Sequence, residues 1–148
     1  MVLNIAAMVC IGLMTRVEFA VSAFINPVLW KLDGSAQMQA IRLFAGRLGF
    51  VMPFWYGLSL AFLLVETFIL RNRPRALFLA IASCIWAVVI VLTLIFLVPI
   101  NKRLALLESL AALDTALSDH RRWDARHRVR VAAPGAGMVL FLVSITGH

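Results

Sequence analysis

The chain has 148 residues, of which 63% are hydrophobic and only 14% charged, with a formal net charge of +7. Soluble domains have roughly 45–50% apolar and 25% charged residues, and a soluble fold of this length could not bury so much apolar surface. The composition therefore excludes a soluble enzyme, a disordered segment and a disulfide-stapled secreted domain. The basic residues lie between the apolar runs, which is typical of membrane topology rather than of nucleic-acid binding.

Four apolar runs are long enough to cross a bilayer, which takes roughly 20 residues as a helix. We place these runs at about 3–30, 50–70, 76–98 and 129–145. Because lipid makes a backbone satisfy its own hydrogen bonds, each run is predicted to be a helix. The whole chain, 1–148, is thus expected to form one all-α domain, a four-transmembrane-helix up-down bundle. The first run has no basic stretch before it, which favours a span over a cleaved signal peptide.

The connections between the runs differ in kind. Residues 71–75 form a tight basic turn, and Pro74 prevents the helix from continuing through it. Residues 35–48 carry an apolar stripe at helical spacing, which predicts an interfacial amphipathic helix between the first two spans. Residues 101–117 predict a helical extension between the third and fourth spans, and 119–130 predict a charged helical lead-in to the fourth.

The basic residues give opposing indications of orientation. One side carries ten of them and the other three, which favours both termini outside the cytoplasm. The arginine-rich turn is itself typical of a cytoplasmic anchor, so both orientations stay open. The ten are Lys31, Arg42, Arg47, Lys102, Arg103, Arg121, Arg122, Arg126, Arg128 and Arg130, and the three are Arg71, Arg73 and Arg75.

Polar and helix-breaking residues recur at one depth of the predicted bundle. A count of about 20 to 22 residues along each helix from the basic turn reaches the opposite interface. The residues found there are Asn26-Pro27, Pro53, Asn101 and His127. Prolines at that depth can leave backbone carbonyls free for a side chain or a ligand. We therefore expect the candidate site at this level.

The first span carries a buried acid in the prediction. Glu18 lies about two helical turns deeper than Asn26, where an ionised carboxylate costs several kcal/mol unless it is paired. It is expected to face the bundle interior, either as a proton carrier or as the structural partner of an arginine. Arg16 lies on the other side of the same helix and is expected to pair with Glu66 of the second span. The alternative partners of Glu66 are Arg71 and Arg73.

Four residues of the fourth segment share one helix face: His120, Trp123, His127 and Arg130. An imidazole exchanges protons near neutral pH, a guanidinium neutralises an oxyanion or a carboxylate, and an indole stacks on a flat ligand. The alternative is a basic and aromatic belt at the membrane surface. Asp124 and Arg128 fall elsewhere and are expected to form an ordinary solvated i,i+4 pair.

No metal or cofactor is predicted, although haem, copper and quinone stay open. His120 and His127 are about 10.5 Å apart along a helix axis, too far to share one ion directly. Neither HExxH nor CxxC occurs in the chain.

Three motifs follow one another at the residues just described. They are EF with FINP within 18–27, LVPINKR at 97–103, and a tryptophan followed by RHRVR within 123–130. Together they resemble the anthrone oxygenase-like family of small four-helix integral membrane proteins, whose bacterial members are mostly domains of unknown function. The resemblance implies an oxidoreductase that uses O₂ on a planar lipophilic substrate, of the anthrone, polyketide or quinol type.

The implied chemistry suits the residues. An anthrone CH₂ is acidic because its anion delocalises into a phenolate, so a base, oxyanion donors and a dry pocket allow reaction with O₂. We expect three catalytic residues: His127 as base, Glu18 as proton sink or alternate base, and Arg130 as oxyanion donor. Four others are expected to bind substrate: Asn26 and Asn101 at the oxyanion, and Trp123 and Tyr56 on the rings.

Two functions other than catalysis stay open, an accessory subunit of a larger membrane complex and a quinone- or lipophile-binding membrane protein. The expected partners are the lipid bilayer and a small lipophilic substrate, without nucleic acid. A homo-oligomer or a larger membrane complex is compatible with the sequence. We expect a multi-pass protein of a bacterial inner (plasma) membrane.

Overall fold

The computed structural model describes residues 2–106 and 113–146, and every regular element within them is helical. Four helical segments are long and apolar enough to cross a membrane: Val2–Leu29, Gly34–Ile69, Ala76–Ala105 and Asp114–Thr146. The prediction of an all-α, four-span membrane protein is confirmed. The elements in order are α1 (Val2–Ala20), η1 (Val21–Ile25), α2 (Asn26–Leu29), α3 (Gly34–Ile69), α4 (Ala76–Leu92), η2 (Thr93–Leu97), α5 (Val98–Ala105) and α6 (Leu113–Thr146).

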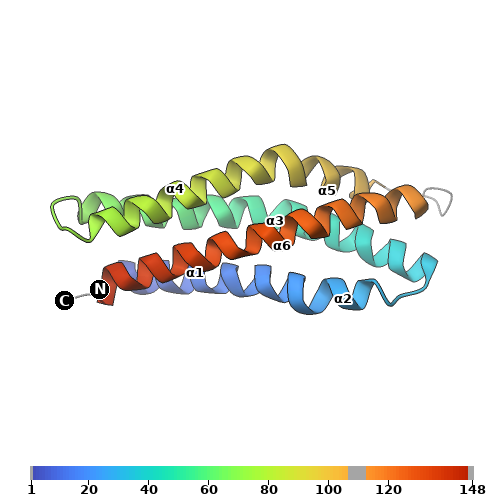
Figure 1. Ribbon diagram of the computed structural model, residues 1–148, viewed down its shortest axis with the longest axis horizontal. Coiled ribbons are helices and arrows are strands. Elements are labelled where there is room, and N and C mark those ends of the chain that lie inside the picture. The colour runs from blue at the N-terminus through green and yellow to red at the C-terminus, as the bar shows by residue number, and fades with distance from the viewer. Residues whose placement is uncertain (1, 107–112, 147–148) are drawn as a thin grey trace.

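The helices alternate in direction along one long axis (Figure 1). The start of α1 and the end of α6 lie at the same end of the bundle as the tight turn between α3 and α4. Large apolar side chains cover the outside, for example Phe54, Phe68 and Val88 at 77%, 65% and 57% exposure. Such a surface needs lipid around it.

Three of the spans extend further than predicted at the end away from the basic turn. The stripe at 35–48 is helical, as expected, but it continues into the second span as a single helix, α3. The reason lies in the buried face, because Ile41, Ala45, Met52 and Tyr56 follow one another at helical spacing across the junction. Pro53 is accommodated inside this helix without ending it.

Two short π-helical turns were not predicted. Each ends two residues before a proline: η1 at Ile25 before Pro27, and η2 at Leu97 before Pro99. In each turn a backbone N–H reaches five residues back, from Asn26 to Val21 and from Val98 to Thr93. A proline lacks the N–H for the α-helical bond and its ring crowds the carbonyl four residues before it, so a widened turn is a natural accommodation.

The buried apolar residues form two clusters with a polar layer between them. The turn-side core consists of Ala7, Ile11, Met14, Met52, Tyr56, Leu63, Leu79, Ala82, Trp86, Val89 and Phe141. The far-side core consists of Val21, Leu29, Ile41, Ala45, Leu97, Ile100, Leu104, Ala116 and Trp123. Glu18 falls between Met14 and Val21 in the chain, and Thr93 falls between Val89 and Leu97. The two cores therefore bracket a layer of buried polar side chains.

Close helix packing holds the turn-side core together. A Cβ on Gly137 would lie 3.1 Å from two ring carbons of Trp86. A glycine at 137 therefore lets α6 pack closely against α4. Gly135 has nothing within 4 Å of such a Cβ, so its lack of a side chain serves no contact within the bundle.

The predicted ion pair between Arg16 and Glu66 is wrong. Among the residues described, no ion pair joins Glu66 to Arg16, Arg71 or Arg73. Arg16 instead lines a hollow on the outside of α1 and α6, while Glu66 is only 2% exposed and its Oε1 has no hydrogen-bond partner in 2–106 or 113–146. The prediction matched the depths of Arg16 and Glu66 along their helices. The rotation of each helix about its own axis, however, points the two side chains in different directions.

Candidate active site

The aromatic and imidazole face of α6 points into the bundle. His120, Trp123 and His127 are 4%, 7% and 1% exposed. Their rings stack in succession, with centroids 6.0 Å apart for His120 and Trp123 and 4.5 Å apart for Trp123 and His127. Trp30 extends the row, with its ring centroid 4.8 Å from that of His120. This burial argues against a surface belt, whose rings would lie at the headgroups.

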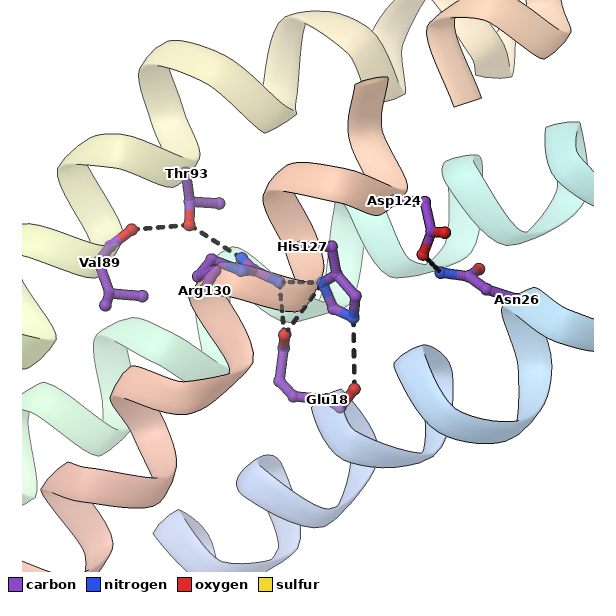
Figure 2. A network of polar contacts seen from close by, with 7 residues as sticks. All are labelled: Glu18, Asn26, Val89, Thr93, Asp124, His127 and Arg130. Carbon is purple, nitrogen blue, oxygen red and sulfur yellow. Dashed lines mark hydrogen bonds and ion pairs between the residues drawn. The ribbon is translucent and has the colours of Figure 1, made fainter. Parts of the chain in front are cut away.

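Beside this row, charged and polar groups from three elements meet (Figure 2). Glu18 comes from α1, Thr93 from η2, and His127 and Arg130 from α6. Arg130 Nη2 donates to Glu18 Oε2 at 2.5 Å, and Arg130 Nη1 donates to the Thr93 hydroxyl at 2.9 Å. We call these four residues the polar cluster. Its guanidinium compensates the buried carboxylate, as a low-dielectric interior requires.

The contacts of His127 indicate which ring nitrogen carries the proton. Arg130 Nη2 lies 3.0 Å from Nδ1, and a guanidinium only donates. Nδ1 is therefore the acceptor, and the proton is assigned to Nε2, which faces the backbone carbonyl of Glu18 at 3.3 Å. Glu18 Oε2 is also 3.4 Å from Nδ1. The imidazole lone pair thus faces both the guanidinium and the carboxylate.

The pair of Asp124 and Arg128 differs from the prediction. Arg128 Nη2 does donate to Asp124 Oδ2 at 2.8 Å. However, Asp124 is 6% exposed rather than solvated, and its Oδ1 accepts a 2.6 Å hydrogen bond from the Asn26 amide. Asn26, which is 1% exposed, therefore binds Asp124 and not the polar cluster (Figure 2). This contact joins α2 to α6 across the bundle.

Two residues that the sequence reasoning missed, Asp124 and Thr93, are part of this layer. Asp124 follows His120 by four and precedes His127 by three, so the same helical spacing that selected the histidines also selects it. Thr93 is a hydroxyl residue in an otherwise apolar run just before Pro99. Its hydroxyl donates to the Val89 carbonyl at 2.7 Å while it accepts from Arg130.

The remaining predicted residues surround the polar cluster. The Arg130 guanidinium carbon lies 5.2 Å from the centre of the Tyr56 ring, within the range of a cation–π contact. Tyr56 is 1% exposed, and its hydroxyl interacts with the Glu18 carboxylate. Asn101 is a half-buried residue of α5 that packs against α3, where a Cβ on Gly49 would lie 3.4 Å from the Asn101 Cβ.

Two small cavities, each of about 20 Å³, adjoin these side chains. The first is lined by Asn26, Asn101, His120 and Trp123 among others. The second is lined by Asn101, Trp123 and all four members of the polar cluster. Each has room for about one water molecule, so the closed arrangement around His127 does not by itself accommodate a planar multi-ring molecule.

The chain was compared with protein families, curated proteins and solved structures. Residues 41–140, two thirds of the chain, match the sequence model of the anthrone oxygenase family. This range contains Asn101, Trp123, His127 and Arg130, whereas Glu18 and Asn26 precede it. No curated protein and no solved structure matched. With its match across most of the bundle, the chain belongs to the anthrone oxygenase family.

Proposed function

We propose that this protein is an O₂-dependent oxidoreductase that acts on a planar lipophilic substrate of the anthrone or quinol type by base-assisted deprotonation. The observation that carries the proposal is the buried contact among Glu18, His127 and Arg130 in a member of the anthrone oxygenase family. A carboxylate, an imidazole and a guanidinium within hydrogen-bond reach can remove a proton and stabilise the resulting anion.

For an anthrone, the proposed reaction begins at the CH₂ group. The base removes one proton, and the C–H electron pair delocalises onto the carbonyl oxygen as a phenolate. The carbanion carbon then forms a bond with O₂, and protonation gives a hydroperoxide. Loss of water with the second hydrogen of that carbon leaves a new carbonyl. One atom of O₂ ends in the quinone and the other in water, so anthrone and O₂ give anthraquinone and H₂O.

Arg130 connects the base to the anion in this proposal. Its Nη2 holds both His127 Nδ1 and Glu18 Oε2, which occupies the lone pair that a base needs. The carbonyl oxygen of the bound substrate competes for the guanidinium, which releases Nδ1 to accept the proton while that oxygen becomes a phenolate. Glu18, 3.4 Å from Nδ1, then stabilises the imidazolium or takes its proton.

The binding residues are proposed to act at different distances from this centre. Asn101 lines the same small cavity as His127 and Arg130, which supports a role at the oxyanion. Trp123 stacks on His127 and Tyr56 lies against Arg130, which supports contact with flat rings. The Asn26 amide is bound to Asp124, so its contribution is to hold α2 against α6 unless the substrate displaces that contact.

The decisive experiment follows turnover of an anthrone by purified protein in detergent micelles. Under ¹⁸O₂ the wild type is expected to give a quinone with one labelled oxygen. His127→Ala is expected to lower kcat by about 10²–10⁴-fold, the usual contribution of a general base. Cys84→Ser, at an exposed position of α4, is the control and keeps full activity.

Three outcomes would contradict the proposal at different points. Full turnover by folded His127→Ala removes the proposed base. Unlabelled product removes O₂ as the oxygen source. Tight binding of the anthrone by the wild type without any product favours a lipophile-binding protein.

We also infer a bacterial inner membrane as the location, which fractionation of the native membranes tests.

A further inference from the structure

A groove on the outside of the bundle adjoins the polar cluster. It lies between the α4–η2 segment and α6 and has a volume of about 670 Å³, within the range of sites for small molecules. Its polar lining is Arg126 and Arg130, and the rest is apolar and includes Leu92, Phe96, Leu97 and Ala133. Val88, Leu92 and Val129 are 57%, 44% and 78% exposed, so the groove faces lipid in a membrane.

Two residues belong both to this groove and to the small cavity at Glu18 and His127. They are Arg130 and Leu97. Leu97 is 3% exposed and ends the π turn η2, whose first residue, Thr93, holds Arg130. These two side chains are therefore what stands between a molecule in the groove and the imidazole.

Arg130 also has an unused donor. Its side chain is 8% exposed, and its Nε–H has no hydrogen-bond partner within 2–106 and 113–146. A buried donor without a partner is costly unless a ligand or water satisfies it. At the same groove, the Arg126 guanidinium carbon lies 5.1 Å from the Phe96 ring centre. The groove thus offers an aromatic contact and two cations to a flat molecule with an acidic oxygen.

A second hollow on the outside of the bundle provides a comparison. It has a volume of about 520 Å³ and lies between the first span and α6, where it is lined by Thr15, Arg16, Phe19, Ala20, Phe24, Val131 and Gly135. None of these residues lines either small cavity or belongs to the polar cluster. The two hollows are similar in size, and both lie on the outside of the bundle. The first groove differs from the second because Arg130 lines it.

We propose that the planar lipophilic substrate reaches the site from the lipid through the groove between α4–η2 and α6, with its oxygen at Arg130. Leu97 is then the side chain that the rings displace to bring the reacting carbon to His127. The inference rests on the proposed function and adds the docking site and a residue that controls access. π-helical turns are often found at functional sites. Here the turn η2 contributes Phe96 and Leu97 to the lining of the groove.

The test uses an azido-anthraquinone as photoprobe, with the labelled peptides identified by mass spectrometry. In the wild type, labelling is expected within 85–97 and 125–133. Ala133→Phe fills the groove and is expected to reduce that labelling and the kcat/KM for an anthrone by about tenfold or more. Ala20→Phe makes the same change at a similarly half-buried position in the second hollow, and is expected to alter both by no more than about twofold.

Folding is checked by thermal unfolding of each variant, and Leu92→Trp supplies a second way to fill the groove if Ala133→Phe does not fold. Labelling within 15–24, with loss in Ala20→Phe alone, would overturn the proposal. The proposal would also be overturned if a photoreactive fatty acid labelled the groove equally and the anthraquinone did not displace it, because the groove would then bind lipid and not the substrate. Groove labelling without turnover contradicts the proposed function instead, and turnover with labelling elsewhere contradicts only the docking site.

Discussion

The two halves of the bundle use their buried polar side chains differently. On the turn side, buried hydroxyls donate to carbonyls of their own helix, as Ser83 does to Leu79 and Ser144 to Phe141. The turn-side contacts between helices join only neutral groups, for example Ser83 to Thr67 at 3.4 Å and Trp55 to the Cys10 carbonyl at 3.2 Å. In the polar layer, the bonds between helices involve charged groups, from Arg130 to Glu18 and from Asn26 to Asp124. A span needs no such contacts to be stable in lipid, because its backbone is already satisfied. Polar groups that are held across helices at a cost are therefore the better indication of function.

The largest effect on stability is expected from the ion pair in the polar layer. Arg130→Met leaves the Glu18 carboxylate buried without a cation, and removal of one partner of such a pair costs about 3–5 kcal/mol. Thermal unfolding in detergent, followed by circular dichroism, measures the loss. Arg130→Met with Glu18→Gln is expected to recover most of it, since no charge is then left uncompensated. If Arg130→Met alone were as stable as the wild type, the ion pair would not contribute to stability, and the polar layer would not differ from the turn side in this respect.

An intermediate effect is expected on the turn side, where volume rather than charge is critical. Gly137→Val places side-chain atoms against the Trp86 ring, which a Cβ alone already approaches to 3.1 Å. Overpacking of this kind costs about 1–3 kcal/mol. Gly135→Val, which has open space around its Cβ position, is the matched control in the same unfolding experiment. Equal destabilisation by both would show that the loss comes from helix propensity and not from packing.

The smallest effect separates one hydroxyl from another. Thr93→Val removes the acceptor for Arg130 Nη1. Thr67→Val removes a hydroxyl that contacts only neutral groups, the Leu63 carbonyl on its own helix and Ser83 Oγ at 3.4 Å. Thr93→Val is expected to cost about 1 kcal/mol more, because it leaves a charged donor without its partner. It is also expected to lower kcat for an anthrone, while Thr67→Val leaves kcat unchanged. The same loss of kcat in both variants would contradict a specific role for the Thr93 hydroxyl in positioning Arg130.

Local pattern was sufficient for a large part of the site. The spacing of His120, Trp123, His127 and Arg130 predicts one face of a helix, and these residues do share the buried face of α6. The depth count also predicted that His127 and Asn101 lie near one level, and they do line one cavity. Glu18, predicted about two turns deeper than Asn26, lines the same cavity. Both inferences depend only on helix geometry and bilayer thickness, which do not change from one bundle to another.

Partner choice between helices was much less predictable. The depth count paired Arg16 with Glu66, but Arg16 faces outward and Glu66 lies buried without an ion-pair partner in the described part of the chain. The helix-face spacing of the fourth segment predicted a solvated Asp124, although Asn26 holds it inside the bundle. Helical period gives the direction of a side chain on its own helix and says nothing about how far that helix is rotated toward its neighbours.

The amino-acid sequence alone determined the number of spans, their alternating course and the inward face of α6, because apolar run length and helical period are local properties. Tertiary packing alone decided that Arg130 meets Glu18, which lies 112 residues away, and that Asn26 meets Asp124. Those contacts depend on the rotation and axial shift of each helix, which are set by the fit of residues such as Gly137 against Trp86 and by the widened turns before Pro27 and Pro99. Packing of this kind sums many small contacts over the whole bundle, so no single segment of the sequence contains it.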